Sequence, residues 1–174
     1  MRPYLKLLLG GLLCVAWVSG AFFSGAQAAP KTINFQFTDV NGKSIRLSDY
    51  KGQWVLVNFW APWCPLCWEE VPDLNDLNKR RDFVVIGMGL DYGPDANIVV
   101  ETAQRHNLNF EAIVAGGSRR NPDSPFRQVG PVDFYPTSYL YDPNGEMVMF
   151  IPGLIKVKRI NAFIDTWRQI QSAK

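Results

Sequence analysis

The chain has 174 residues, with 18 lysine and arginine residues against 16 aspartate and glutamate residues. Two of the basic residues, Arg2 and Lys6, lie at the N-terminus, so the rest is formally neutral and has no basic run, which argues against a nucleic-acid partner. A chain of this length can bury its own core as a single domain.

The first 28 residues have the pattern of a secretory signal peptide. The two basic residues precede an apolar run from Leu7 to Phe23, and the small-residue sequence Ala26-Gln27-Ala28 matches a cleavage site before Ala29. An uncleaved membrane anchor is the alternative, because the run approaches the roughly 17 to 25 residues that span a bilayer. In both cases we expect residues 29–174 to form one domain in the periplasm, with membrane contact only through an uncleaved N-terminal segment.

The next segments predict a β-hairpin and then a buried strand. Asn41-Gly42 lies between two short extended segments, which is a hairpin signal. The run from Trp54 to Trp60 is almost continuously apolar and of strand length, as in strands buried on both faces. We therefore predict strands at 32–37 and 43–47, a turn at 48–52 and a strand at 54–60.

The remainder alternates helical and extended patterns. Cys64 opens a predicted helix to about Arg81 with a kink at Pro72, and Pro143-Asn144-Gly145 marks a second hairpin. The other predicted elements are strands at 83–90, 110–114, 137–141 and 147–151, helices at 95–107, 126–129 and 156–171, and a loop at 115–125. This order predicts an α/β fold: a three-layer α/β/α sandwich with a mixed central sheet, helices on both faces and an N-terminal β-hairpin.

The cysteines are too few and too close together to stabilise the fold as long-range cross-links. Of the three cysteines, Cys14 lies in the signal segment, which leaves Cys64 and Cys67. A bond between these two closes a very short loop, for which the entropic stabilisation is smallest. A chemical role is therefore better supported than a structural one.

The spacing of the pair suits thiol–disulfide exchange. A cysteine at the start of a helix has its thiolate stabilised by unpaired N–H groups and the helix dipole, so we expect Cys64 to be the exposed attacking sulfur. Cys67 follows one turn later, within disulfide reach, and is expected to resolve mixed disulfides. Pro65 suits the first helical position.

Other uses of a cysteine pair fit less well. A c-type haem site requires histidine where Trp68 stands, and a zinc site requires four ligands, whereas His106 is the single histidine. A peroxiredoxin would have threonine or serine at Ala61. Two thiolates could bind Cu(I), which stays an alternative. We expect no cofactor and no resident metal ion.

The stretch VLVNFWAPWCPLCWEEVP resembles the active-site signature of the thioredoxin superfamily, specifically of exported TlpA/ResA/DsbE-like thiol-disulfide oxidoreductases. The resemblance runs from about Phe35 to the C-terminus and includes Tyr135-Pro136-Thr137, Leu140-Tyr141-Asp142 and Asn144-Gly145. It implies a thioredoxin-like fold and a redox-active Cys64–Cys67 disulfide.

The resemblance also implies roles for residues around the pair. Glu70 is expected to transfer protons to and from Cys67, although it could simply complement the positive end of the helix. Asn58 stands where cytosolic thioredoxins resemble one another in carrying a buried aspartate, and it could instead hydrogen-bond buried backbone. Pro136 is expected to be a cis proline facing the disulfide, with the backbone of Tyr135 pairing with an extended substrate segment.

Aromatic residues beside the cysteines suggest a surface for a protein partner. Trp63, Trp68 and Tyr135, with Leu66, could form an apolar docking patch, whereas Trp68 could alternatively pack into the core. His106 is expected at the surface at a helix end.

The function implied by this resemblance is reduction of disulfides in exported proteins, which could include apocytochrome c before haem attachment. A membrane electron donor is a further expected partner. The motif contains no histidine to stabilise the reduced thiolate, which favours a reductant over an oxidant. A disulfide-forming or isomerising oxidant, a Cu(I)-binding protein and a redox-inactive binding domain remain the alternatives.

Overall fold

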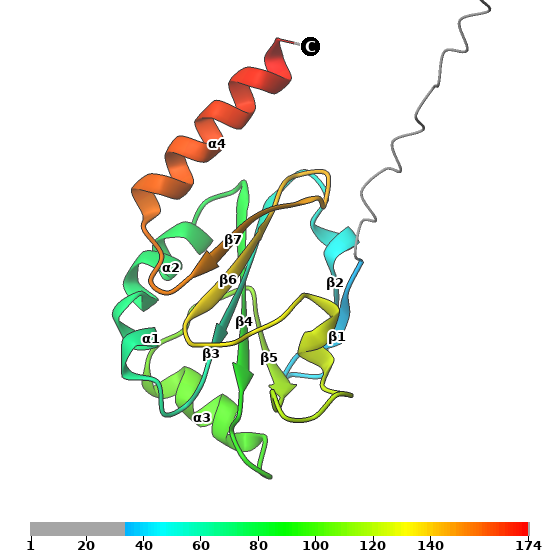
Figure 1. Cartoon of the computed structure of the whole chain (residues 1–174), viewed down its shortest axis with the longest axis vertical. Coiled ribbons are helices and arrows are strands. Elements are labelled where there is room, and N and C mark those ends of the chain that lie inside the picture. The colour runs from blue at the N-terminus through cyan, green and yellow to red at the C-terminus, as the bar shows by residue number, and fades with distance from the viewer. Residues whose placement is uncertain (1–33, 174) are drawn as a thin grey trace, which may run out of the picture.

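The computed structural model describes residues 34–173 (Figure 1). The signal segment, its cleavage site and Cys14 lie outside these residues, so the expectations about them stay predictions. The described elements, in chain order, are β1 (Gln36–Thr38), β2 (Ser44–Arg46), the 3-10 helix η1 (Leu47–Tyr50), β3 (Trp54–Trp60), α1 (Pro65–Glu69), α2 (Val71–Asn78), β4 (Phe83–Leu90), α3 (Asn97–Arg105), β5 (Ala112–Gly117), the 3-10 helix η2 (Pro125–Gln128), β6 (Thr137–Tyr141), β7 (Met147–Pro152) and α4 (Val157–Ser172).

The central sheet is mixed, as the alternation of patterns predicted. Its five strands lie in the order β5-β4-β3-β6-β7. Strands β3, β4 and β5 are parallel, whereas β6 and β7 form the antiparallel edge. The central strand β3 is buried along its whole length and pairs with β4 and β6. The N-terminal hairpin, β1 with β2, forms a separate two-stranded antiparallel sheet.

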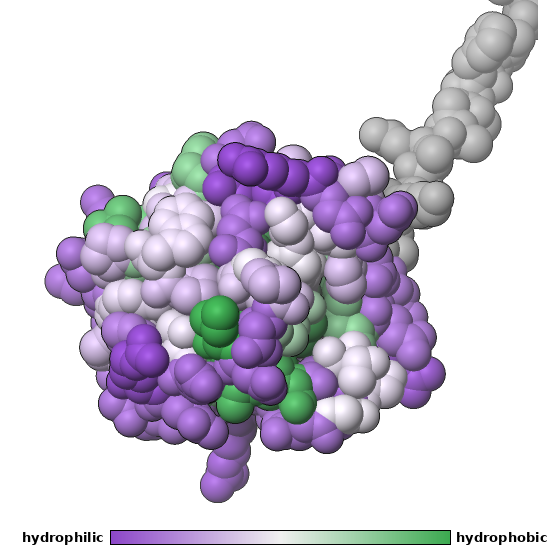
Figure 2. All heavy atoms as spheres, turned by 90° about the horizontal axis from the view of Figure 1, so that it is seen from below, coloured by the Kyte–Doolittle hydropathy of each residue, from purple (hydrophilic) through white to green (hydrophobic). Residues whose placement is uncertain are grey.

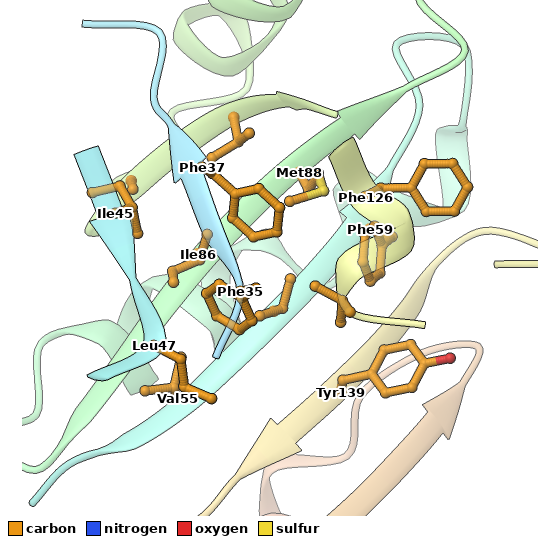
Figure 3. Packing of buried hydrophobic residues seen from close by; sticks show 14 of the residues in the cluster. Phe35, Phe37, Ile45, Leu47, Val55, Phe59, Ile86, Met88, Phe126 and Tyr139 are labelled. Atoms are coloured by element: carbon orange, nitrogen blue, oxygen red, sulfur yellow. The ribbon is translucent and has the colours of Figure 1, made fainter. Parts of the chain in front are cut away.

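The two faces of the central sheet are covered by different kinds of element. All four α-helices lie on one face, where Leu74 of α2 and Ile164 of α4 pack against Leu56 of β3, and Val99 of α3 packs near the cysteines (Figure 1). The other face is covered by the β1–β2 hairpin and the two 3-10 helices. Phe37 belongs to the buried cluster on that face, which Figure 3 shows. The layer opposite the α-helices is therefore built from a hairpin and two 3-10 helices, so the helices expected on both faces are α-helices on one face only.

The helix predicted from Cys64 to Arg81 is in fact two helices that meet at Glu70. Glu70 ends α1 and precedes α2, and its carbonyl accepts from the N–H of Leu74, the first turn of α2. Pro72 has no N–H with which to bond the carbonyl of Trp68 four residues earlier, so a continuous helix cannot form across it. The prediction of a kinked continuous helix was therefore wrong, and α2 ends at Asn78.

Strand β5 begins and ends later than the predicted strand at 110–114. Residues 115–117, predicted to open a loop, continue the strand and pair with the end of β4. Gly116 allows this pairing because a Cβ there would lie 2.4 Å from Cγ of Met88 and 2.5 Å from Cδ2 of Leu90. Gly116 therefore permits close packing in the strand, whereas the sequence pattern was interpreted as the start of a loop.

Within residues 34–173, none of the helices combines the length and the apolar character needed to cross a bilayer.

Candidate active site

The candidate site lies at the end of the sheet formed by the carboxyl ends of the parallel strands β3, β4 and β5. Because parallel strands share their direction, the segments that follow Trp60, Leu90 and Gly117 emerge at the same edge (Figure 1). Open α/β sheets bind ligands at this edge. Figure 2 views the molecule from below, toward this end, and shows small hydrophobic patches set among hydrophilic residues.

The two cysteines form a disulfide at the start of α1. Cys64 is the N-cap residue, Pro65 occupies the first turn, and the Cα atoms of Cys64 and Cys67 lie 5.5 Å apart. The N–H of Cys67 donates a hydrogen bond to the Cys64 sulfur at 3.2 Å. A backbone donor at this position would stabilise negative charge on the Cys64 sulfur after reduction.

Both cysteines are buried in this oxidised form. Cys64 is only 4% exposed and Cys67 2%, so the expectation of an exposed Cys64 does not hold in this state. The exposed residues beside them are Trp63 and Leu66.

Glu70 is a buried carboxyl held by two donors. Its Oε1 accepts from the side-chain amide of Asn58 at 2.8 Å, and its Oε2 accepts from the N–H of Ile155 at 2.9 Å. Glu70 is 2% exposed, whereas its neighbour Glu69 is exposed to solvent. Both oxygens of the Glu70 carboxyl therefore have donors inside the protein, at the residue that ends α1 and precedes α2.

Burial raises the pKa of Glu70 to about 7. The hydrogen bonds from Ile155 and Asn58 favour the ionised form and oppose this shift, and the negative charge of Asp73 adds to it. A carboxyl with this pKa can both accept and release a proton near neutral pH. Perturbed carboxyls of this kind are concentrated at functional sites.

Asn58 contacts side chains and not the backbone partners that were considered for it. Its Nδ2 donates to Glu70 and, at 3.0 Å, to the hydroxyl of Ser138 on the neighbouring strand β6. Asn58 thus fixes the position of the Glu70 carboxyl relative to the sheet.

The peptide bond between Tyr135 and Pro136 is cis. The carbonyl of Pro136 accepts a hydrogen bond from the N–H of Gly153 at 2.9 Å, which ties this turn to the loop before α4. Tyr135 packs against the buried cluster that contains Cys64 and Cys67. The segment before Pro136 therefore lies beside the disulfide.

Trp63 and Trp68 occupy different environments. Trp63 is 59% exposed, and its ring meets the ring of Tyr135 edge to face at 5.5 Å. Trp68 is partly buried: it stacks on His106 at 3.9 Å and meets Trp60 edge to face at 5.5 Å. His106 caps the end of α3 as expected, but its ring covers Trp68, and burial lowers its pKa. A role of Trp68 in substrate binding stays a prediction.

Two residues that the sequence did not single out complete the site. Asp91 follows β4 directly, and its carboxylate accepts from the hydroxyl of Tyr135 at 2.9 Å and from Nε of Arg119 at 2.7 Å. The guanidinium of Arg119 lies over the ring of Tyr135, 4.4 Å from its centroid. The only signal available in the sequence was the place of Asp91 directly after the strand predicted at 83–90.

The described residues contain no group of three or more histidine, cysteine, aspartate or glutamate side chains placed to hold a metal ion.

Comparisons with known proteins identify the family of the chain. The model of the AhpC/TSA family matches residues 26–149. A thiol-disulfide oxidoreductase ResA from Bacillus cereus is 33% identical over 170 residues, covering 94% of this chain and 93% of that protein.

Solved structures share the fold. An exposed lipoprotein thioredoxin from Streptococcus pneumoniae is 26% identical with a TM-score of 0.58, over 76% of this chain and 98% of that one. A secreted disulfide oxidoreductase of Mycobacterium tuberculosis, homologous to Escherichia coli DsbE, has a TM-score of 0.60 at 18% identity, over 79% of this chain and 99% of that one. The chain therefore belongs to the AhpC/TSA family of thioredoxin-like proteins and is a thiol-disulfide oxidoreductase of the ResA type.

Proposed function

We propose that this protein reduces disulfide bonds of exported proteins outside the cytoplasm, through the dithiol form of Cys64 and Cys67. The observation that carries the proposal is a local disulfide at a helix start, close in sequence to a buried carboxyl with a pKa of about 7. The N-terminal pattern of a signal peptide supports the location. The pneumococcal relative is an exposed lipoprotein and the mycobacterial one is secreted, which also supports it.

In the first step, the Cys64 thiolate attacks one sulfur of the substrate disulfide. The substrate S–S bond breaks, one substrate sulfur leaves as a thiolate, and a mixed disulfide joins Cys64 to the other. In the second step, Cys67 gives its proton to the ionised carboxylate of Glu70 and attacks the Cys64 sulfur. The second substrate thiolate then leaves, two electrons have passed to the substrate, and the Cys64–Cys67 disulfide has formed.

Glu70 transfers the proton, and Asn58 holds Glu70 in position. The side-chain amide of Asn58 does not titrate near neutral pH, so proton transfer cannot run through it. It instead holds the Glu70 carboxylate by a hydrogen bond of 2.8 Å.

Regeneration of the Cys64–Cys67 dithiol requires an external dithiol donor, for which a membrane protein is the candidate. Apocytochrome c, reduced before haem attachment, is one candidate substrate.

The redox potential of the pair tests the direction of electron flow. We expect a value close to the roughly −270 mV of thioredoxin and well below the roughly −120 mV of a strong oxidant. Equilibration with glutathione, followed by gel-shift quantification of free thiols, measures it. A value near −120 mV would overturn the reductant assignment. Failure to exchange with glutathione at all would favour a redox-inactive binding domain, and Cu(I) titration of the reduced protein tests the copper alternative.

Trapping tests the roles of the two sulfurs. Cys67→Ser removes the resolving thiol, so mixed disulfides with exported proteins should accumulate on Cys64 and disappear on treatment with a reductant. Cys64→Ser is the matched control and should trap no partner. Equal trapping by both variants would contradict the assignment of Cys64 as the attacking sulfur.

A further inference from the structure

Asp91 connects the two aromatic residues that flank the cysteines. Its backbone carbonyl accepts from Nε1 of Trp63 at 3.3 Å, and its carboxylate accepts from the hydroxyl of Tyr135 at 2.9 Å. The same carboxylate accepts from the hydroxyl of Ser118 at 3.0 Å and from the N–H and Nε of Arg119 at 2.9 and 2.7 Å. The side chain of Asp91 thus joins the segments that follow β4 and β5 to the turn before Pro136, and its backbone carbonyl adds the segment that follows β3.

These bonds favour the ionised carboxylate and a protonated tyrosine. Burial acts to raise the pKa of Asp91, but the hydrogen bonds from Arg119, Tyr135 and Ser118 together hold that pKa below its usual value. Burial and the bond to Asp91 raise the pKa of the Tyr135 hydroxyl, so it remains a donor. The network therefore keeps its protonation state across neutral pH.

Arg119 extends the network to the backbone of the turn. Its guanidinium stacks on Tyr135 at 4.4 Å and donates to the carbonyl of Asp133 at 2.8 Å. The ring of Tyr135 thus contacts both Arg119 and Trp63, whose ring it meets edge to face at 5.5 Å. A side chain held on these sides loses little freedom when a partner binds, which favours affinity.

Four residues of this network, Trp63, Asp91, Ser118 and Arg119, also line a large open cavity. The cavity has a volume of about 1140 Å³ and lies between the segments after β4 and β5, with Trp63, Asp91, Tyr92, Arg119, Arg120 and Asp133 among its lining residues. Sites for small molecules typically span about 300 to 1000 Å³. The cavity adjoins Trp63, the residue before Cys64, and its lining combines aromatic rings with polar and charged groups. These features suit an extended polypeptide segment.

We propose that Asp91 is a positioning residue for polypeptide substrates: its carboxylate fixes Tyr135, its backbone carbonyl binds Trp63 beside Cys64, and the adjoining cavity receives the chain that flanks the substrate's reacting cysteine. This inference rests on the proposed function, because it concerns the substrate of the same disulfide. The inference predicts that the residues around Asp91 lower the KM for polypeptide disulfides more than the KM for small disulfides such as glutathione disulfide.

Asp91→Asn is a conservative test. Asp91 has a backbone φ of 51°, in the left-handed region that aspartate and asparagine both tolerate better than other residues. The variant keeps the backbone and one acceptor oxygen but loses the ion pair with Arg119. Asp82→Asn is the matched control: Asp82 lies at the opposite end of the same strand β4 and is paired with Arg80 and Arg168.

The readout is the Michaelis constant for a synthetic peptide of about twelve residues with one internal disulfide, compared with that for glutathione disulfide. For Asp91→Asn, the ratio of the peptide KM to the glutathione disulfide KM should rise about tenfold, the size expected for one charge-assisted hydrogen bond. The redox potential should remain that of the wild type. For Asp82→Asn, the ratio should remain that of the wild type. Equal changes for both substrates, no change, or a shifted potential would overturn the inference.

A second variant keeps the test decisive if Asp91→Asn folds poorly. Tyr135→Phe retains the ring and loses only the hydroxyl that bonds Asp91, so the KM ratio should rise in the same direction. If Asp91 acts through Tyr135, the double variant should change the ratio no more than the larger single change. Full additivity would contradict this route.

The potential separates this inference from the proposed function. A wild-type protein with the potential of an oxidant would refute the proposed direction of electron flow. The KM comparison would then be made with the reduced peptide and reduced glutathione, and the expected tenfold ratio would still test Asp91.

Discussion

Asn58 on β3 donates a hydrogen bond of 2.8 Å to the carboxylate of Glu70, twelve positions further along the chain. The other oxygen of that carboxylate accepts from the N–H of Ile155, in the loop before α4. A titratable group is thereby held between the central strand, the junction of α1 with α2, and a loop from the far end of the sequence. Its protonation influences both the chemistry and the stability of the protein.

Replacing Glu70 should change the pH dependence of the resolving step. In the wild type, the rate at which Cys67 releases a mixed disulfide should rise with pH around 7, as Glu70 ionises and becomes a proton acceptor. Glu70→Gln should slow this step about 100-fold at pH 7 and move the rise to the pKa of the Cys67 thiol. Stopped-flow measurement of mixed-disulfide decay checks this. The exposed Glu69→Gln is the control, and a wild-type profile in Glu70→Gln would exclude Glu70.

The same carboxyl should make the protein less stable as pH rises. Below pH 4.5 the group is protonated in both states; between pH 4.5 and about 7 it ionises first in the unfolded chain, so stability is lost across this window and then levels off. The loss should be about 3 kcal/mol in the free energy of unfolding. Urea denaturation of the oxidised protein should show this slope in the wild type and in Glu69→Gln, and a flatter one in Glu70→Gln. Parallel slopes in all three would contradict it.

Asn58 should tune the pKa of Glu70. Asn58→Ala removes a donor that favours the ionised carboxylate, so the pKa of Glu70 should rise above 7 and the inflection of the rate profile should move to higher pH. Above that pH the variant should also lose about 1 to 3 kcal/mol of stability. Ser138→Ala removes the other partner of Asn58 and leaves both bonds to Glu70, so it should keep the inflection near pH 7. If Ser138→Ala moved the inflection to higher pH and Asn58→Ala did not, this role of Asn58 would be refuted.

Trp63 and Trp68 should differ in what they contribute. Trp68→Ala removes a ring packed between Trp60 and His106, so the free energy of unfolding should fall by about 2 to 3 kcal/mol. Trp63→Ala removes a ring that is 59% exposed and should cost less than about 1 kcal/mol, while raising the KM for peptide disulfides. Chemical denaturation and peptide kinetics measure the two effects. A Trp68→Ala protein of normal stability with a raised KM would identify Trp68 as a docking residue.

Gly116→Ala should destabilise the end of β5 by about 1 to 3 kcal/mol, because the added Cβ would overlap the side chains of Met88 and Leu90. Thermal or urea unfolding measures the loss. Combining it with Met88→Ala makes room for the methyl group, so the two costs should be less than additive. Strict additivity would show that packing against Met88 is not the cause.

Much of the fold could be read from local patterns. The apolar run ending at Trp60, the two hairpin turns and the Cys64–Cys67 spacing depend on neighbours within a few residues, so they identified the mixed sheet, its antiparallel edge and the disulfide. The predicted helix to Arg81 failed because the effect of Pro72 on the carbonyl of Trp68 was interpreted as a kink, whereas the chain starts a new helix. Gly116 was misinterpreted because a glycine that permits close packing cannot be distinguished from a turn glycine without its neighbours in space.

The amino-acid sequence alone therefore identifies the reactive cysteine pair. The two cysteines lie at a helix start, behind a buried strand, and the expected mature chain has no other cysteine. Only the tertiary structure shows which residues surround and control the cysteine pair. Glu70 meets Ile155 across 85 positions, and Asp91 meets Tyr135 across 44. Burial and hydrogen bonding between such distant residues set the pKa of one carboxyl and the position of two aromatic rings, because desolvation and hydrogen bonds depend on distance in space and not on distance along the chain.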